Sequence, residues 1–318
     1  MSEESDSLEV LCIGEALAVL HTSDEWDDAV RPQFHIRTGG AESNVALHLA
    51  VQGIEAGWFS RVGDDPFGRM VTSDLAKAGV DVSRVAVDAA RPTGMYVKDV
   101  TGDGAAVMHY HRAGSAASHL RAEDLERLPI GLVSWVHISG ITTALSHTAS
   151  EMVDALFDAC KAAGTQVSFD VNFRPRLWER DRAAVRLRHL AQRSDLVLVG
   201  RDEAEDLWGT RSPQDVFDHL NGPRLIVVKD AGVGATELDR STRLGQTFVA
   251  TPPVDVVELI GAGDAFAGGY LAGLIRGESS HRRLMRGHES AGWTIGSSDD
   301  ARPGHVARPF CTDTEAAR

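Results

Sequence analysis

The segment with the clearest chemical potential is Gly261-Ala262-Gly263-Asp264, which leads into a run of small and apolar residues at helical spacing, 265–275. The two glycines allow a tight bend and lack the Cβ atoms that would keep a ligand away from the backbone. A helix that begins here presents unpaired N–H groups and a positive dipole end to an anion. Asp264 would be repelled by a phosphate at this place unless its carboxylate accepts a proton. The segment therefore indicates phosphoryl transfer to a hydroxyl that Asp264 deprotonates, with an ordinary helix start as the alternative.

A second pair of glycines, Gly39-Gly40, stands directly before a predicted helix over 41–52 that carries Asn44 near its start. An open glycine backbone can approach a sugar closely, and the Asn44 amide can hold hydroxyl groups. The alternative is a plain loop-to-helix turn.

Three polar residues, Asp170, Asn172 and Arg174, follow the predicted strand 166–170 at alternating positions. Alternation places them on one side of the chain, and the carboxyl ends of parallel strands are the usual location of ligand groups. The alternative is a polar junction between a strand and a loop.

Another predicted strand, 224–229, ends at Lys229 and runs into a turn that contains Gly232 and Gly234. Such a turn could pass under a nucleotide. A hairpin turn without a ligand is equally compatible with these residues.

Short apolar runs alternate with helical patterns along most of the chain, which predicts a parallel sheet with crossover helices. Two segments, 18–37 and 92–111, alternate in polarity and are too polar for central strands, so we expect them to form a small projecting sheet, a lid. The tail 302–318 is polar and carries no predicted element. The expected strands are 8–13, 57–61, 131–138, 166–170, 196–199 and 224–229, and the expected helices are 41–52, 67–78, 148–163, 180–193, 262–276 and 282–293.

The composition limits the class of protein. The chain has 318 residues, 43% of them hydrophobic, and a formal net charge of −14, which is typical of a globular protein and argues against a nucleic-acid surface. The chain has no apolar run of about 18 residues and no secretory signal over 1–9, so we expect a cytoplasmic protein without a membrane partner. The cysteines Cys12, Cys160 and Cys311 are widely spaced, which suits a reducing compartment, and we expect the first two to be buried.

Taken together and in this order, the motifs resemble the ribokinase (PfkB) family of carbohydrate kinases. The resemblance extends over 10–293, and the segments 39–44 and 261–264 are its most specific parts. It implies a three-layer α/β/α core with a mostly parallel sheet plus a small projecting β-sheet lid, in a single domain over 1–318. A dinucleotide-binding fold is excluded because the first strand is not followed by G-x-G-x-x-G, and a P-loop is excluded because no Gly-Lys-Ser/Thr triplet occurs.

Within the family, the stretches 39–44, 91–96, 110–116 and 170–178 are most similar to kinases of 2-keto-3-deoxygluconate. Arg112 and Arg174 would supply positive charge for a carboxylate, and Tyr96 and Tyr110 would supply hydroxyl donors and a flat wall. The alternatives are lid packing for the tyrosines and a solvated surface side chain for Arg112. The resemblance assigns to the sugar acid Gly39, Gly40, Asn44, Tyr96, Tyr110, Arg112, Asp170, Asn172 and Arg174.

The resemblance also implies the reaction, which is ATP-dependent phosphorylation of the terminal hydroxyl of the sugar acid. Asp264 would be the general base, and the backbone around Gly261, Ala262 and Gly263 would form an anion hole. Mg²⁺ would bind with Glu203 acting through a water molecule, and a monovalent cation is left open. The nucleotide residues would be Lys229, Gly232, Gly234 and His288.

Two departures from the family pattern leave alternatives open. Glu258-Leu259-Ile260 stands where threonine hydroxyls are usual, and Gly200 stands where an asparagine is usual. The alternatives are a kinase for a neutral sugar such as fructose or ribose, a nucleoside kinase, a kinase for the galactonate epimer, and a non-catalytic binding homologue. We also expect a homo-oligomer, a dimer or larger, because the projecting sheet has an edge and a face to cover.

Overall fold

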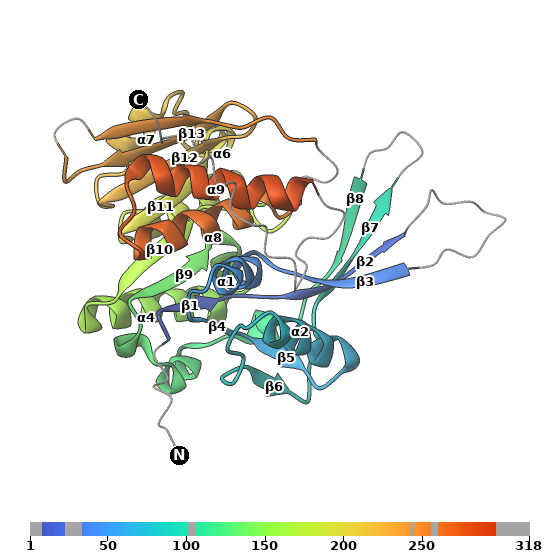
Figure 1. Ribbon diagram of the computed structural model, residues 1–318. Coiled ribbons are helices and arrows are strands. Elements are labelled where there is room, and N and C mark those ends of the chain that lie inside the picture. The colour runs from blue at the N-terminus through green and yellow to red at the C-terminus, as the bar shows by residue number, and fades with distance from the viewer. Residues whose placement is uncertain (1–7, 23–33, 101–105, 243–244, 256–259, 297–318) are drawn as a thin grey trace, which may run out of the picture.

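The computed structural model of the protein describes residues 8–22, 34–100, 106–242, 245–255 and 260–296. Its core is an eight-stranded sheet in which six neighbouring strands are parallel and two strands at one edge are antiparallel (Figure 1). The central strands are continuous apolar runs, such as VLCI in β1, because a parallel sheet is buried on both faces. The order across the sheet is β14 (Gln246–Ala250), β13 (Gly234–Asp239), β12 (Leu225–Asp230), β11 (Leu196–Gly200), β10 (Gln166–Asp170), β9 (Trp135–Ser139), β1 (Val10–Ile13) and β4 (Ala56–Phe59).

Helices cover both faces of this sheet, so the predicted three-layer α/β/α core is confirmed (Figure 1). Alternate residues of each strand point to opposite layers. In β9, Val136 and Ile138 pack in the hydrophobic cluster of one layer, whereas Trp135 packs in the cluster of the other. One layer contains α4 (His147–Ala163), α5 (Arg180–Ala191), α6 (Arg201–Trp208) and α7 (Pro213–His219), with α3 (Gly140–Ala144) before α4. The other contains α1 (Ala41–Val51), α2 (Pro66–Lys77), α8 (Ala262–Ile275) and α9 (Ser280–Ile295).

A second sheet projects from the core, as the two polar segments predicted (Figure 1). Its two outer pairs are antiparallel, and its two central strands are parallel. Parts of the predicted lid, 23–33 and 101–105, and the predicted tail, 302–318, lie outside the described residues. The strand order is β3 (Phe34–Gly39), β2 (Leu17–Thr22), β7 (Met95–Val100) and β8 (Ala106–His111), and a further small sheet pairs β5 (Arg61–Gly63) with β6 (Ala86–Asp88).

The predicted elements differ from the structure mainly where the chain is short or irregular. The strand expected over 131–138 begins only at Trp135, because the residues before it form a 3₁₀ helix, and the strand expected over 57–61 is divided into β4 and β5. The short helices α3, α6 and α7 and the two antiparallel strands β13 and β14 were not predicted. The 3₁₀ helices are η1 (Ala117–His119), η2 (Ala122–Arg127) and η3 (Ile130–Leu132).

Cys12 and Cys160 are buried and unpaired with each other, as expected, and Cys311 lies outside the described residues. Within the described ranges, none of the helices combines the length and apolar character that crossing a membrane requires.

Candidate active site

The glycine turn before α8 adopts the conformation that the sequence predicted. Gly261 caps the helix with φ = 82°, in the left-handed region that favours glycine, and its carbonyl accepts a hydrogen bond of 2.9 Å from the N–H of Ala265. The helix behind the turn is buried on all sides. A Cβ on Gly269 would lie 2.4 Å from Ser290 Oγ, so glycine is required for the close packing of α8 on α9. The close packing of α8 on α9 therefore helps to hold the turn in place.

Asp264 lies in the first turn of α8, where side chains from three distant parts of the chain meet. Its Oδ2 accepts a hydrogen bond of 2.9 Å from Asn44 Nδ2 in α1, and its Oδ1 accepts a longer one of 3.4 Å from Asn172 Nδ2 after β10. Burial raises the pKa of Asp264 to about 7, with Asp170 adding to the rise, while the bond from Asn44 and the charges of Arg174 and Lys229 oppose it. The carboxylate is thus poised to exchange a proton near neutral pH, which suits a general base.

Lys229, near the end of β12, lies in the same cluster. Its Nζ donates to Asp170 Oδ2 at 2.7 Å, and a Cβ on Gly263 would lie only 3.7 Å from this nitrogen. Burial acts to lower the pKa of Lys229, but the carboxylates of Asp170, Glu203 and Asp264 outweigh it and raise that pKa above its ordinary value. A permanent positive charge therefore stands beside the glycine turn. The other oxygen of Asp170, Oδ1, is buried without a hydrogen-bond partner.

Glu203 bridges the ends of two neighbouring strands. One carboxylate oxygen accepts from the N–H of Phe173 after β10, and the other accepts from the N–H of Gly200 at the end of β11, both at 2.9 Å. Burial is the largest cause that raises the pKa of Glu203, and Asp170 adds to it. The charge of Arg174 lowers the pKa of both Glu203 and Asp264, which places this exposed arginine at the cluster. Asn172 has φ = 40°, so the expected alternation of side chains does not continue past the end of β10.

A second group of predicted residues lies on the projecting sheet. Tyr96 and Tyr110 are cross-strand partners with ring centroids 5.2 Å apart, and the Arg112 guanidinium lies 5.7 Å from the centre of the Tyr110 ring. Arg112 is not a solvated surface residue, because its side chain is only 12% exposed and forms an ion pair with the buried carboxylate of Glu15. One bond connects this group with the Asp264 side, since Arg176 Nη1 donates to the carbonyl of Met108 in β8 at 2.5 Å.

The glycine pair of the second motif lies between the two groups. Gly39 is the last residue of β3 and pairs with Leu17 of β2. Gly40 is the N-cap residue of α1 and makes no side-chain capping hydrogen bond. A Cβ on Gly40 would lie 2.4 Å from the carbonyl oxygen of Glu15, so this crossing point is too tight for any other residue.

Of the other residues predicted for the nucleotide, two lie in the hairpin that follows Lys229 and one lies in α9. Gly232 lies in the turn between β12 and β13, which is the hairpin that the sequence left open, and Gly234 begins β13. His288 in α9 is buried; its Nε2 lies 3.1 Å from the carbonyl oxygen of Val249, and its ring packs edge-on against Phe266. Burial lowers the pKa of His288. These contacts show that His288 packs in the core. Its contact with the nucleotide stays a prediction.

Sequence reasoning missed two buried carboxylates beside the site. Glu15 follows β1 and pairs with Arg112. Glu42 in α1 accepts three hydrogen bonds at Oε1, from the N–H and hydroxyl of Ser139 and from the hydroxyl of Thr142, and so fastens α1 to the end of β9. The available signal was their position, because an acidic residue directly after a buried strand or within an apolar helix needs a partner.

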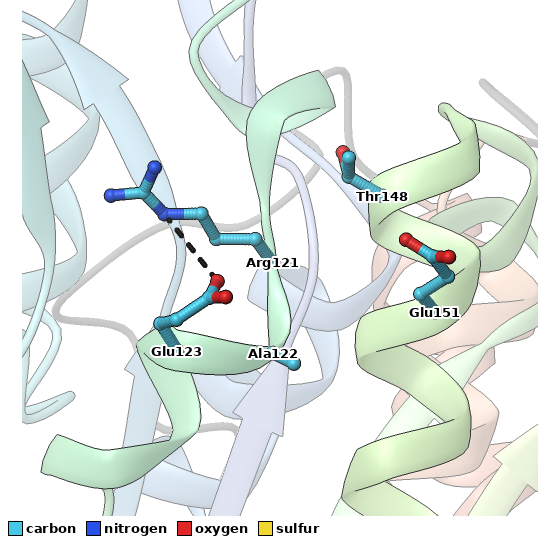
Figure 2. A pocket seen from close by; sticks show the side chains of 5 residues that line it. All are labelled: Arg121, Ala122, Glu123, Thr148 and Glu151. Atoms are coloured by element: carbon cyan, nitrogen blue, oxygen red, sulfur yellow. Dashed lines mark ion pairs between the residues drawn. The ribbon is translucent and has the colours of Figure 1, made fainter.

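A surface hollow of about 530 Å³ lies elsewhere, between η2 and α4 (Figure 2). Its lining includes the ion pair of Arg121 with Glu123, 3.8 Å apart, and Glu151 of α4. The hollow contains none of the predicted site residues, so it does not extend the candidate active site.

Comparison with known proteins agrees with this geometry. The model of the pfkB family of carbohydrate kinases matches residues 7–305. The chain is 32% identical over 304 residues to a 2-dehydro-3-deoxygluconokinase of Bacillus subtilis (strain 168), covering 94% of this chain and 91% of that protein. It is 34% identical over 241 residues to a fructokinase of Klebsiella pneumoniae, covering 74% of this chain and 76% of that protein. The crystal structure of a PfkB protein from Polaromonas sp. JS666 superposes with a TM-score of 0.84 at 34% identity, covering 91% of this chain and 96% of the other. Since the family model matches nearly the whole chain, the protein belongs to the pfkB family of carbohydrate kinases and is an ATP-dependent sugar kinase.

Proposed function

We propose that this kinase transfers the γ-phosphoryl group of ATP to the terminal hydroxyl of 2-keto-3-deoxygluconate, which is 2-dehydro-3-deoxygluconate under another name. The product would be 2-keto-3-deoxy-6-phosphogluconate. The observation that carries the proposal is Asp264, a carboxylate with its pKa raised to about 7 in the first turn of a glycine-started helix, with Lys229 beside it. Enzymes place general bases at such pKa values when they work near neutral pH.

In the proposed reaction, Asp264 takes the proton of the sugar hydroxyl while the hydroxyl oxygen forms a bond to the γ-phosphorus. The bond from that phosphorus to the bridging oxygen breaks, and ADP leaves with the electron pair. Backbone N–H groups of Ala262, Gly263 and Asp264 would stabilise the charge on the phosphoryl oxygens, and one such donor is typically worth about 10² to 10³ in rate. Lys229 would add a full positive charge on the same side, and Asp170 would hold it there.

Magnesium is expected with ATP, and the residues present fit it. Asp170 has a buried oxygen without a partner, and Glu203 lies close enough to Asp170 for the charge of one to raise the pKa of the other. These two carboxylates would hold Mg²⁺ through its retained water molecules. When bound, Mg²⁺ supplies positive charge to the β- and γ-phosphates. The stretch that bears on a monovalent cation, 258–260, lies mostly outside the described residues.

The choice of a sugar acid rests on two arginines in a chain with a net charge of −14. Arg174 is exposed at the Asp264 cluster, and Arg112 lies under the tyrosine pair of the projecting sheet. A carboxylate at Arg174 would meet a planar, bidentate donor of the kind that carboxylates prefer, and Arg112 would add a further hydrogen-bond donor. The Bacillus subtilis relative, at 32% identity, carries the name of this activity.

One observation favours a second candidate, a neutral sugar such as fructose. The buried Glu15 cancels the charge of Arg112, so the projecting sheet offers donors without net positive charge. The Klebsiella pneumoniae relative, at 34% identity, is named a fructokinase. Arg174 would then be the only unpaired charge for a carboxylate among the described residues assigned to the sugar.

The deciding experiment is a panel of 2-keto-3-deoxygluconate, 2-keto-3-deoxygalactonate, fructose and ribose, with ATP and magnesium, followed by ADP release. The proposal requires kcat/KM for a keto-deoxy acid to exceed that for either neutral sugar by at least about tenfold, the effect of one charge-assisted hydrogen bond. A preference for fructose would replace it with the second candidate.

We also propose that the protein is a homodimer that covers the outer face of the projecting sheet. Phe34 and Ile36 of β3 are 42% and 45% exposed on a strand at the edge of that sheet. An exposed apolar edge strand is a surface that proteins usually cover. Sedimentation at micromolar concentration should give twice the mass of 34.2 kDa, and a monomer would contradict the proposal.

A further inference from the structure

The four chain crossings between the core and the projecting sheet converge on one buried residue, Glu15. The chain passes from β1 to β2 through 14–16, from β3 to α1 through 39–40, into β7 through 92–94, and out of β8 through 112–115. Glu15 is 2% exposed, and its side chain or backbone contacts each of the other three crossings.

The contacts of its carboxylate are divided between two residues that follow β8. Oε2 accepts a hydrogen bond of 2.7 Å from Arg112 Nε and forms an ion pair with Nη2 of the same guanidinium. Oε1 accepts a hydrogen bond of 2.5 Å from Ser115 Oγ. Both oxygens are therefore satisfied, and the guanidinium is held along the edge formed by Nε and Nη2.

The other two crossings leave space for Glu15 because both contain a glycine at the contact, one at its carboxylate and one at its main-chain carbonyl. A Cβ on Gly94 would lie 2.7 Å from Glu15 Oε1, and a Cβ on Gly40 would lie 2.4 Å from the Glu15 carbonyl oxygen. The local backbone is therefore arranged around Glu15, and among the described residues the hydrogen bonds of its carboxylate go to Arg112 and Ser115 rather than to the Asp264 cluster.

Because Nε and Nη2 of the Arg112 guanidinium are bound to Glu15, its Nη1 group is the one that can donate to a ligand. The same guanidinium lies 5.7 Å from the centre of the Tyr110 ring, which is 42% exposed. A free arginine would sample many rotamers, whereas a bidentate ion pair with a buried carboxylate allows few. The Glu15–Arg112 pair also has no net charge. It would therefore orient a ligand through hydrogen bonds and attract an anion only weakly.

We propose that Glu15 is a positioning residue that acts through Arg112: it fixes the direction of the guanidinium toward the sugar and cancels its charge. This inference rests on the proposed role of Arg112 in sugar binding. It assigns recognition of sugar shape to the Glu15–Arg112 pair and leaves attraction of a carboxylate to Arg174.

The matched variants are Glu15→Gln and Glu15→Ala. The glutamine amide can keep both contacts, because its oxygen can accept from Arg112 and its nitrogen can donate to Ser115 Oγ. The alanine removes both. We expect Glu15→Ala to raise the KM for the sugar by at least about tenfold, since a misplaced binding group costs this much or more. The kcat and the KM for ATP should change by less than about threefold, and Glu15→Gln should restore the KM for the sugar to within about threefold of wild type.

A double-mutant cycle tests the route of the effect. If Glu15 acts through Arg112, Glu15→Ala should add less than about twofold to the KM in an Arg112→Ala background. A further tenfold rise there would overturn the proposal. Ser115→Ala is the control, since it removes a contact of Oε1 alone and should leave the KM for the sugar within about threefold. The cycle uses whichever sugar the wild type phosphorylates best, so a wrong substrate assignment does not decide it.

A spectroscopic measurement requires no substrate. The ¹⁵N–¹H resonance of Arg112 Nε, identified by its loss in Arg112→Ala, should be protected from solvent exchange in wild type and in Glu15→Gln, and lost or averaged in Glu15→Ala. An unchanged resonance in Glu15→Ala would show that Glu15 does not hold the guanidinium, even if no sugar in the panel is a substrate.

Discussion

The replacement Asp264→Asn tests both the catalytic and the energetic argument about the active site, because it removes one charge and keeps the size of the side chain. The new amide oxygen can still accept from Asn44 Nδ2, which now lies 2.9 Å from the carboxylate. Sugar and ATP should therefore bind with KM values near those of wild type. Turnover should fall by about 10² to 10⁴, the usual contribution of a positioned general base.

The same variant should be more stable than wild type above neutral pH. The pKa of Asp264 is raised from its ordinary 3.8 to about 7, so between these values the folded state binds more protons than the unfolded state. Stability from this group is fully present below pH 3.8 and is lost as the pH rises through 7. At 1.36 kcal/mol for each pH unit the full penalty is about 4 kcal/mol, and we expect about half because the side chain is only partly buried. Asp264→Asn should therefore raise Tm at pH 8 by about 4 °C and much less at pH 4.

Two assays check these expectations. The log of kcat/KM for wild type should rise with pH and level off above about 7, because the protonated carboxyl is inactive as a base. Thermal unfolding at pH 4 and pH 8 measures the stability difference. Asp202→Asn, the same change at an exposed position in the first turn of α6, is the control and should alter neither quantity. Near-wild-type turnover in Asp264→Asn would refute the base assignment, and a lower Tm at pH 8 would refute the desolvation argument.

Three further substitutions separate the other roles. Lys229→Gln should lower kcat by about 10², with a smaller effect on the KM for the sugar, because the Lys229 charge lies beside Gly263 at the place proposed for the phosphoryl group. A change confined to the KM for ATP would show that Lys229 only binds the nucleotide. Arg174→Ala should raise the KM for a sugar acid by about tenfold and leave that for fructose unchanged, and equal effects on both would contradict its role in attracting the carboxylate. Gly261→Ala should destabilise the fold by about 1 kcal/mol or more, measured by urea unfolding, and lower kcat, because its φ of 82° strains any residue with a Cβ; wild-type stability would show that the turn relaxes.

The sequence could predict the layers of the fold because the core strands are uniformly apolar and the long helices carry clear periodicity. The short helices α6 and α7 were missed because their eight and seven residues contain too few turns for a helical period to be recognised. The two antiparallel strands β13 and β14 were missed as well. The turn at Lys229 was predicted as a motif, but its hairpin geometry depends on the antiparallel pairing of β12 with β13, which lies outside the local residues.

The candidate residues were largely recognisable by type, whereas their pairings were not. Asn44 and Asp264 are 220 positions apart in the chain, and Glu15 and Arg112 are 97 apart. Nothing local in the sequence indicates that Asn44 supports a carboxylate or that Arg112 has a partner that cancels its charge. Such facts arise only when strands β1 and β10 and helices α1 and α8 bring their ends to one edge of the sheet.

The charges around Asp264 explain how a chain with a net charge of −14 can hold a highly charged anion at this edge. Lys229 and Arg174 both lower the pKa of Asp264, whereas the carboxylate of Asp170 raises it, so the base strength of Asp264 depends on which neighbours are occupied. An incoming phosphate would engage Lys229 and weaken its effect on Asp264. The proton affinity of the carboxylate would then rise, at the moment when the sugar hydroxyl must lose its proton. Lys229, which lies beside the place proposed for the phosphoryl group, would therefore couple the arrival of that group to the strength of the base, because Lys229 and Asp264 lie in the same cluster.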